Sequence, residues 1–396
     1  MSGVFEALVG QPDAVTTLSA AARAAGEVVR GAAVSDPAAM THAWLFTGPA
    51  GSGRSVAARA LAAALQCEFG GCGECQACHT TLVGTHPDVR FVVPEGLTIG
   101  VQEMRALVLR AQGAPSLGRW QVLLVEDADR LTEQAGNALL KAIEEPPPRT
   151  VFLLCTPSTH PDDVSVTIRS RCRLITLRQP SADAVAAVLM QRDGTDPQRA
   201  GWAAAAAQGH VGRARRLAND PQARSRRDAV LAIPRKLTGI GACFEAASAL
   251  IEAAEAEAAA TVSELDATER TELETALGAG GTGKGAAGAV RGAAGVLRDL
   301  ERKQKSRATR VRRDSLDRAL IDLAGFYRDA LVRRINAPVT PVHGDVADVS
   351  ASAAQRWTPE SALRRLEAIL ACREAIELNV KPKIAVEAMM LSLWRG

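Results

Sequence analysis

The sequence has few aromatic residues and no long hydrophobic run. Only 3% of its 396 residues are aromatic, with a single Tyr, which disfavours a single-stranded DNA channel built on base stacking. No run approaches the roughly 18 apolar residues of a membrane-spanning helix, so we expect no membrane segment. The first residues lack the basic and then apolar pattern of a secretory signal peptide. The net charge of +3 is too small to indicate nucleic-acid binding by itself.

What remains is the composition of an ordinary globular protein. Hydrophobic residues make up 47% of the chain and charged residues 23%. The length allows two or three domains with substantial cores. We therefore expect a cytoplasmic protein and look for function in local motifs.

A glycine-rich turn stands between an apolar run at 44–47 and a segment of helical composition that begins at residue 56. It holds the glycines and the serine of a phosphate-binding loop: Gly48, Gly51, Gly53 and Ser55. Such a loop curls its amide groups around an anion, and the following helix adds its partial positive charge. Arg54 stands where the pattern has Lys and keeps the charge on a bulkier planar group. The pattern predicts phosphate binding with impaired geometry; the alternative is a turn without a ligand.

Carboxylates follow the β-rich run 121–125. In phosphate-loop folds, an Asp and then a Glu at this place handle Mg²⁺ and the attacking water. Here the order is reversed, as Glu126 and Asp127, which predicts a second weakened part of the same site. Thr156 ends the strand predicted at 151–156 and should lie at the same edge of the sheet. A solvated strand end is the alternative for the two carboxylates.

Four of the eight cysteines cluster within a short glycine-containing segment, with the spacing C-x4-C-x2-C-x2-C: Cys67, Cys72, Cys75 and Cys78. Four thiolates at this spacing predict a closed structural Zn²⁺ site. The first three also fit the spacing of plant-type two-iron ferredoxins, whose fourth ligand lies far downstream. Unligated thiols are a further alternative, and the adjacent His79 is a competing ligand. The other four cysteines are isolated and are expected to be small buried residues.

A family resemblance rests on several of these segments together. Ser170-Arg171-Cys172 is similar to the SRC motif of AAA+ clamp-loader subunits, and residues 121–178 resemble their core. With Gly10-Gln11, the glycine-rich turn, the cysteines and residues 137–145, the chain resembles the delta-prime type of bacterial DNA polymerase III subunits; the gamma/tau type carries the same modules. The resemblance implies an α/β AAA+ fold, which is a RecA-like parallel sheet with helices on both faces, plus a helical lid and an all-α C-terminal collar.

The resemblance also implies roles for two arginines. Arg171 would act in trans, with its guanidinium against ATP bound on a neighbouring subunit. A solvated or salt-bridged loop arginine is the alternative. Residues 209–217 are similar to the sensor-2 segment of the lid, which would make Arg213 a phosphate contact in cis; an arginine on the helix surface is the alternative.

We expect a core at 1–178, a lid at 179–222 and a collar at 223–396 with a low-complexity insertion around 275–313. Residues 278–285 imitate a phosphate loop, but no strand precedes them and Gly285 replaces the Ser or Thr, so a flexible linker reaching to residue 295 is expected.

The rest of the collar is predicted to be helical, with a polar loop at 338–354 between helices at 315–335, 359–378 and 382–394. The basic run 298–313 is predicted to be a solvated helix face paired with the acidic stretch before it. The alternative is a contact with the DNA backbone.

The function implied by the resemblance is that of a structural subunit of the sliding-clamp loader within the polymerase III holoenzyme, with weak or absent ATPase activity of its own. Its partners would be the delta and gamma/tau subunits and, through the complex, the sliding clamp and primer-template DNA at the replisome in the nucleoid. Structural Zn²⁺ and ATP/Mg²⁺ at a degenerate site are the implied cofactors. The alternatives are an active gamma/tau-type ATPase and an independent DNA-binding module.

Overall fold

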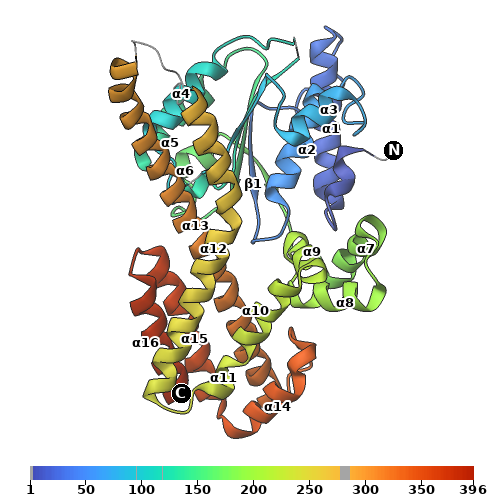
Figure 1. Cartoon of the computed structure of the whole chain (residues 1–396). Helices are drawn as coiled ribbons and strands as arrows, with labels where there is room; N and C mark the ends of the chain where they lie inside the picture. The colour runs from blue at the N-terminus through green and yellow to red at the C-terminus, as the bar shows by residue number, and fades with distance from the viewer. Residues whose placement is uncertain (1–2, 95, 118, 277–285) are drawn as a thin grey trace. The chain divides into compact units, whose positions relative to one another are not determined.

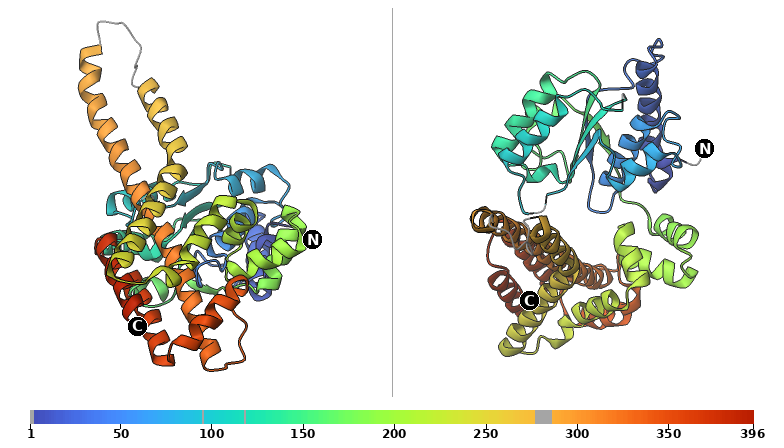
Figure 2. Two further views of the ribbon diagram at one scale, coloured as in Figure 1. Left: turned by 60° about the horizontal axis from the view of Figure 1, so that its bottom comes forward. Right: turned by 45° about the horizontal axis from the view of Figure 1, so that its top comes forward.

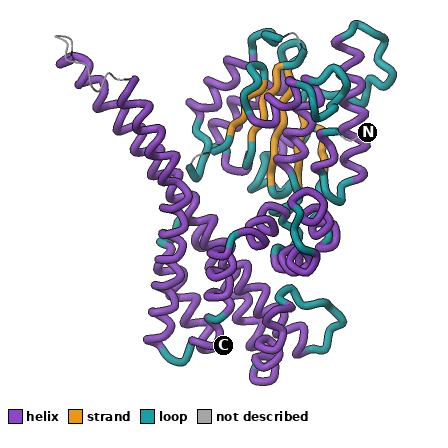
Figure 3. Tube along the Cα trace, turned by 45° about the vertical axis from the view of Figure 1, so that its right-hand side comes forward, coloured by secondary structure: helices purple, strands orange, loops and turns teal. Residues whose placement is uncertain are grey.

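The computed structural model describes residues 3–94, 96–117, 119–276 and 286–396. The chain forms two compact units, Met1–Ala218 and Asn219–Gly396. Among the described residues, all β-strands lie in the first unit, and the second is helical (Figure 3). None of the described helices combines the length and the hydropathy needed to cross a membrane.

The first unit is built around a five-stranded parallel sheet with the order β2-β3-β4-β1-β5. Its strands are β1 (Ala43–Thr47), β2 (Val89–Val92), β3 (Gln121–Val125), β4 (Thr150–Thr156) and β5 (Arg173–Thr176). The three central strands are buried along their whole length, as is typical of a parallel sheet covered on both faces. Because the strands are parallel, all their carboxyl ends meet at one edge, where Thr47 is paired with Thr156.

Helices cover both faces of this sheet (Figure 1). Successive side chains of a strand point to opposite faces, so Trp44 and Phe46 enter one core and Leu45 enters the other. The first core contains α1 (Pro12–Val29) and α2 (Arg54–Gln66), and the second contains α4 (Val101–Ala111) and α5 (Glu133–Glu144). The remaining helices of this region are η1 (Val4–Ala7), α3 (Gln76–Val83), η2 (Ala128–Arg130) and α6 (Val166–Arg169). The predicted α/β fold class is confirmed.

The region predicted as a lid consists of α7 (Ala182–Asp193), α8 (Pro197–Ala206) and α9 (Val211–Asn219). A single turn separates α8 from α9 because Gln208 and Gly209 both have positive φ. These helices group with the sheet in the first unit, so the structure divides the chain in two. The three-part division stays a prediction.

The described residues of the second unit form helices and no strand, as predicted for the collar. It contains α10 (Pro221–Leu231), α11 (Ile233–Lys236), α12 (Ile240–Ala276), α13 (Ala286–Arg334), η3 (Gly344–Val346), α14 (Ala347–Arg356), α15 (Pro359–Glu377) and α16 (Pro382–Arg395). Its core gathers Leu316, Leu320 and Phe326 of α13 with Val386 and Met390 of α16. The long helices α12 and α13 lie side by side as an antiparallel pair (Figure 2).

Two predictions for this unit are wrong, and one is confirmed. The expected linker up to residue 295 is helical from Ala286, because alanines between its glycines favour a helix. The loop expected at 338–354 contains α14, which buries Ala353 and Ala354. The basic run does pair with the acidic stretch, since Arg307 contacts Asp266 and Glu269, and Arg312 contacts Glu255. The segment 278–285, rejected as a phosphate loop, lies outside the described residues.

Candidate functional site

The glycine-rich turn between β1 and α2, here called the glycine loop (residues 48–53), is tightly curled. Gly48, Gly51 and Gly53 have φ of 153°, 83° and 92°. A Cβ at Gly48 would lie 2.4 Å from the Leu177 carbonyl oxygen, and one at Gly51 would lie 2.7 Å from Cα of His210. These two positions therefore exclude larger residues. Helix α2 starts directly after Gly53, and no side chain caps its first turn.

Arg54 and Ser52 both place polar side-chain atoms beside Gly48. Arg54 donates from Nη1 to the carbonyl oxygen of Gly48 at 2.8 Å, so its guanidinium lies across its own loop. Ser52 is 3% exposed, and its Oγ has no hydrogen-bond partner among the described residues. Its Oγ would lie 2.6 Å from a Cβ on Gly48. Ser55 is half-buried in the first turn of α2.

Glu126 and Asp127 follow β3 at the carboxyl edge of the sheet, where they were predicted. Oε1 of Glu126 accepts from Nε of Arg59 at 2.9 Å and pairs with its Nη2 at 2.8 Å. The Arg59 guanidinium also stacks over the Phe91 ring, 4.5 Å from its centroid. Asp127 has φ of 51°, and its carboxylate lies 4.0 Å from Arg130. The longer of the two acids is thus neutralised by an internal cation.

Asp129 is a third acid at this place that the sequence interpretation passed over. Burial, and next to it the charge of Asp127, raise the pKa of its carboxyl above the ordinary value. Its Oδ1 is buried without a hydrogen-bond partner in the described chain. At the end of β4, Thr156 is buried and donates to the Ser158 carbonyl oxygen at 2.8 Å. The Thr156 hydroxyl proton is therefore used within its own loop.

Gln11 has structural contacts that the sequence did not predict. It is 5% exposed, and its Nε2 donates to the carbonyl oxygens of Ser52 at 3.3 Å and of Arg178 at 2.5 Å. Its Oε1 accepts from the Arg178 backbone N–H at 3.1 Å. This amide ties the glycine loop to the chain that leaves β5. The Gly10-Gln11 pair was the signal, but nothing in it indicated a partner 167 residues away.

The start of α9 lies beside the glycine loop. His210 is the residue that a side chain at Gly51 would strike, and its Nδ1 accepts from the backbone N–H of Arg213 at 3.3 Å. Arg213 is therefore within one helical turn of a residue that touches the loop, and its side chain is half-buried. This places Arg213 in the neighbourhood that the sensor-2 resemblance implied. Its role as a phosphate contact stays a prediction.

Arg171 lies at the opposite edge of the sheet. It precedes β5, and Arg173 is paired with Trp44 near the start of β1, whereas the glycine loop follows the end of β1. The four paired residues of β5 span about 13 Å at roughly 3.3 Å per residue. Arg171 is exposed, pairs through Nη2 with Glu144 at 2.8 Å, and donates from Nη1 to the Thr167 carbonyl oxygen at 3.1 Å. Its guanidinium is therefore directed away from its own glycine loop.

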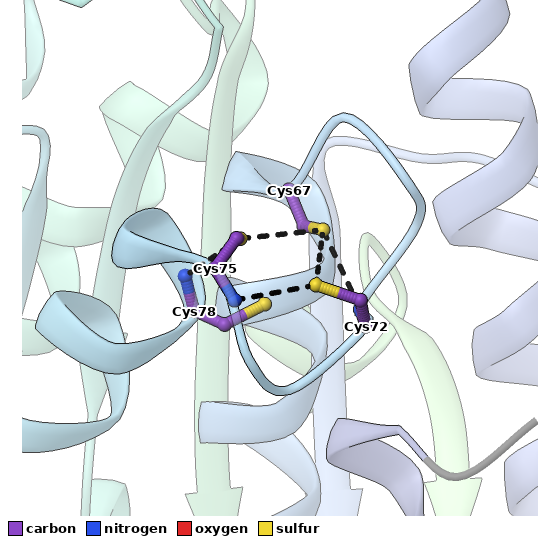
Figure 4. Close-up of side chains that lie close together, drawn as sticks. All are labelled: Cys67, Cys72, Cys75 and Cys78. Atoms are coloured by element: carbon purple, nitrogen blue, oxygen red, sulfur yellow. Dashed lines mark hydrogen bonds between the residues drawn. The ribbon is translucent and has the colours of Figure 1, made fainter.

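The four predicted cysteines converge between α2 and α3 (Figure 4). Their Sγ atoms all lie within 4.8 Å of one another, with 3.6 Å from Cys67 to Cys72 and 3.7 Å from Cys67 to Cys75. A tetrahedron with Zn–S bonds of about 2.3 Å has edges of about 3.8 Å, so the arrangement fits zinc. His79 is not a member of this cluster.

Backbone amides support the same four sulfurs. The N–H groups of Phe69, Gly73, Cys75 and Cys78 each donate to a cysteine sulfur at 3.3–3.4 Å. The pKa of the Cys72 thiol is lowered to about 7, because the N–H groups of Glu74 and Cys75 favour its thiolate. Burial raises the pKa of Cys78, so a cation is needed to complete ionisation of the set. The amides orient the ligands, as the surroundings of metal sites commonly do.

The comparisons with known proteins match the part of the chain that carries these sites. The family model "DNA polymerase III, delta subunit" matches residues 33–181. The delta-prime subunit of Pseudomonas aeruginosa DNA polymerase III is 42% identical over 137 residues, which cover 33% of this chain and 41% of that protein. Over residues 33–181 the chain is therefore similar to subunits of DNA polymerase III.

Relatives of two subunit types match the same region. The Escherichia coli delta-prime subunit is 39% identical over 35% of this chain and 43% of its own length. The tau subunit of Bacillus subtilis is 35% identical over 37% of this chain and 26% of its own length. The chain thus spans about two fifths of the delta-prime relatives that it matches. The five-stranded parallel sheet agrees with the AAA+ fold that the resemblance implies.

Proposed function

We propose that the chain is a delta-prime-type subunit of a bacterial sliding-clamp loader. Its partners are the delta and gamma/tau subunits and, through the complex, the sliding clamp and primer-template DNA at the cytoplasmic replisome. The family match over residues 33–181 supports this role. Within the complex, the chain acts as a structural subunit that supplies one arginine to a neighbour's ATP site.

The observation that carries this proposal is the position of Arg171. It lies at the amino edge of the sheet, opposite the glycine loop, and it is exposed. A phosphate group bound at the chain's own loop is out of its reach, so any phosphate that it contacts belongs to another molecule. A guanidinium in that position stabilises the charge of a transferring phosphoryl group. Its present partner, Glu144, is exposed as well and is easily exchanged for a phosphate.

The chain's own ATPase activity is weak or absent in this proposal. Arg54 replaces the compact ammonium of the usual lysine. Glu126, at the place of the metal-holding acid, is bound by Arg59, and Asp127 is one methylene shorter than the usual water-polarising Glu. Three residues of one catalytic site are therefore altered together. Catalysis of phosphoryl transfer depends almost entirely on such positioning, so the losses compound.

The test is an ATPase assay on the isolated chain and on the reconstituted loader. We expect no measurable turnover by the chain alone and stable co-purification with the delta and gamma/tau subunits. Turnover equal to that of the gamma/tau subunit would favour the rival function, an active ATPase of that type. Failure to join the other subunits would contradict the proposed role altogether.

The second rival, an independent DNA-binding module, has less support. Its basic segment at 298–313 contacts acidic side chains of α12, with Arg307 in a two-carboxylate pair and Arg312 bound to Glu255. Because these cations already pair with carboxylates, their attraction to a phosphate backbone is weaker. Salt-dependent DNA binding by the whole chain, outside the loader, would restore this rival.

The metal proposed for the cysteine cluster is structural Zn²⁺. Metal analysis of the purified chain should find one zinc ion per molecule, and a Cys72→Ser variant should lose it. Thermal unfolding after chelation should occur at a lower temperature, because the metal's binding energy is folding energy. Cys243→Ser, on a cysteine of the second unit, is the matched control. An iron chromophore in the purified chain would contradict the assignment.

A further inference from the structure

We infer that the glycine loop binds the polyphosphate of a nucleotide without a divalent cation, and that Arg59 takes the metal's place as counter-charge to Glu126. The inference deepens the proposed function and rests on the proposal that this loop does not hydrolyse ATP. It states which ligand the loop binds without hydrolysing it. The ligand class is a polyphosphate anion, carried by a nucleoside triphosphate.

The glycine loop has the groups that bind a phosphate anion. The loop curls at Gly48 and Gly51 so tightly that no side chain fits, and the first turn of α2 points uncapped N–H groups into it. Ser52 adds a buried hydroxyl that has no partner in the described chain, an unmet polar group of the kind a ligand satisfies. Arg54 supplies a full positive charge at the curl. Each of these features recognises phosphate oxygens and requires no metal.

At the carboxylates of this site, the charge of Arg59 opposes a metal ion. Both N–H groups of Arg59 that face Glu126 meet the same oxygen, Oε1, at 2.8 and 2.9 Å, and stacking on Phe91 holds the guanidinium there. Mg²⁺ at the other oxygen of Glu126 would lie beside this guanidinium, and the like charge of Arg59 opposes its binding. Among the described residues, three or more acidic, histidine or cysteine ligands converge only at the four cysteines. Glu126, Asp127 and Asp129 therefore do not form a metal cluster.

Charge balance explains why Arg59 matters for an anion that it does not touch. An ionised Glu126 at the end of β3 would repel a phosphate in the adjacent loop, and in an active site the metal cancels that repulsion. Arg59 neutralises Glu126 permanently, so no bound metal is needed to remove this repulsion. The side chain of Asp127, 4.0 Å from Arg130, is balanced by a second cation.

The experiment is calorimetric titration of the full-length chain with ATP, once with excess EDTA and once with Mg²⁺. We expect affinities that agree within about twofold, less than 0.5 kcal/mol. Tripolyphosphate is titrated in parallel: equal affinity assigns recognition to the phosphates alone, and weaker affinity adds a contact to the nucleoside; both agree with the inference. Tighter ATP binding with Mg²⁺, by about tenfold or more, would overturn it.

Two variants separate the roles of the arginines. Arg54→Ala should weaken ATP binding by about tenfold in both buffers, because it removes a charge at the phosphates. Arg59→Met should weaken binding only in EDTA, because the freed Glu126 then repels the anion until Mg²⁺ restores the balance. Glu126→Gln removes that carboxylate and should bind ATP equally in both buffers. Arg110→Met, on an exposed arginine of α4, is the matched control.

The outcomes also separate this inference from the proposed function. Absence of ATP binding in both buffers overturns the inference but leaves the role of Arg171 in a neighbour's site untouched. Exclusion of the chain from the loader contradicts the proposed function even where metal-free binding is found. An Arg59→Met variant that loses its cooperative thermal transition is replaced by the Glu126→Gln titration, which tests the same charge.

Discussion

Two arginine–carboxylate pairs of equal length lie at opposite edges of the central sheet. At the carboxyl edge, Arg59 and Glu126 are 2.8 Å apart, and the glutamate side chain is 15% exposed. At the amino edge, Arg171 and Glu144 are also 2.8 Å apart, and the glutamate side chain is 44% exposed. The two pairs therefore have the same distance but differ in how far their glutamates are buried.

Burial decides whether an ion pair can change partners. An exposed pair contributes about 0–1 kcal/mol, so water or a phosphate replaces the carboxylate at little cost. A partly buried carboxylate that loses its cation is left poorly solvated and is destabilising. Arg171 is thus available to another molecule, whereas Arg59 is committed to its own chain. The same residue type gives a transferable charge at one edge and a fixed one at the other.

The largest expected effect tests the transferable charge. In the reconstituted loader, Arg171→Ala should lower turnover at the neighbouring ATP site about a thousandfold, because an arginine finger contributes about 10³–10⁵ to the rate. Total ATP consumption then falls by the share of that one site. Arg169→Ala, on an exposed arginine two residues earlier, is the control. Unchanged consumption in the assembled loader would remove the difference between the two edges.

The second effect tests the fixed charge. Arg59→Ala should lower the free energy of unfolding by about 1–3 kcal/mol, because it leaves the Glu126 carboxylate without its donors. The double variant with Glu126→Gln should recover part of this loss, since no buried charge remains. Chemical denaturation measures both. A loss below that of an exposed pair would show that the two edges are energetically alike.

A third effect, on the pH dependence of stability, is expected at Asp129, which lies near the partly buried pair at the carboxyl edge. The pKa of Asp129 is raised in the fold, mainly by burial and then by Asp127, so the folded state favours the protonated form. Its contribution to stability is fully present below the unfolded pKa and is lost as pH rises through the folded pKa. Asp129→Asn should therefore be as stable as the parent chain in acid and increasingly more stable above about pH 4. Denaturation across pH checks this; a difference independent of pH would contradict it.

The smallest effect is expected at the exposed glutamate. Glu144→Ala should change the free energy of unfolding by less than about 1 kcal/mol, because its pair with Arg171 is solvated. ATP consumption by the loader should be unchanged or slightly raised, since Arg171 no longer has to leave a partner. Denaturation and the reconstituted assay measure the two quantities. A loss of loader activity comparable to that of Arg171→Ala would make Glu144 a necessary positioning residue.

Much of the first unit was predictable because its strands are short apolar runs with breakers on both sides. The glycine loop and the four cysteines were predictable because their spacing itself encodes the geometry. Arg59 was not, since it lies in an alanine-rich helix with no motif, and its partner is 67 residues away. Helix α14 was missed because it is short and buries mainly small side chains, which leave a weak periodic signal.

The sequence by itself determined the parallel-sheet fold, the glycine loop, the four converging cysteines and the resemblance of residues 33–181 to DNA polymerase III subunits. These features depend on local spacing and on side-chain type, which a linear pattern contains. Only the tertiary structure decided which carboxylate each arginine neutralises and at which edge of the sheet Arg171 lies. Ion pairing and burial depend on which strands and helices become neighbours, and that is settled when distant segments pack together.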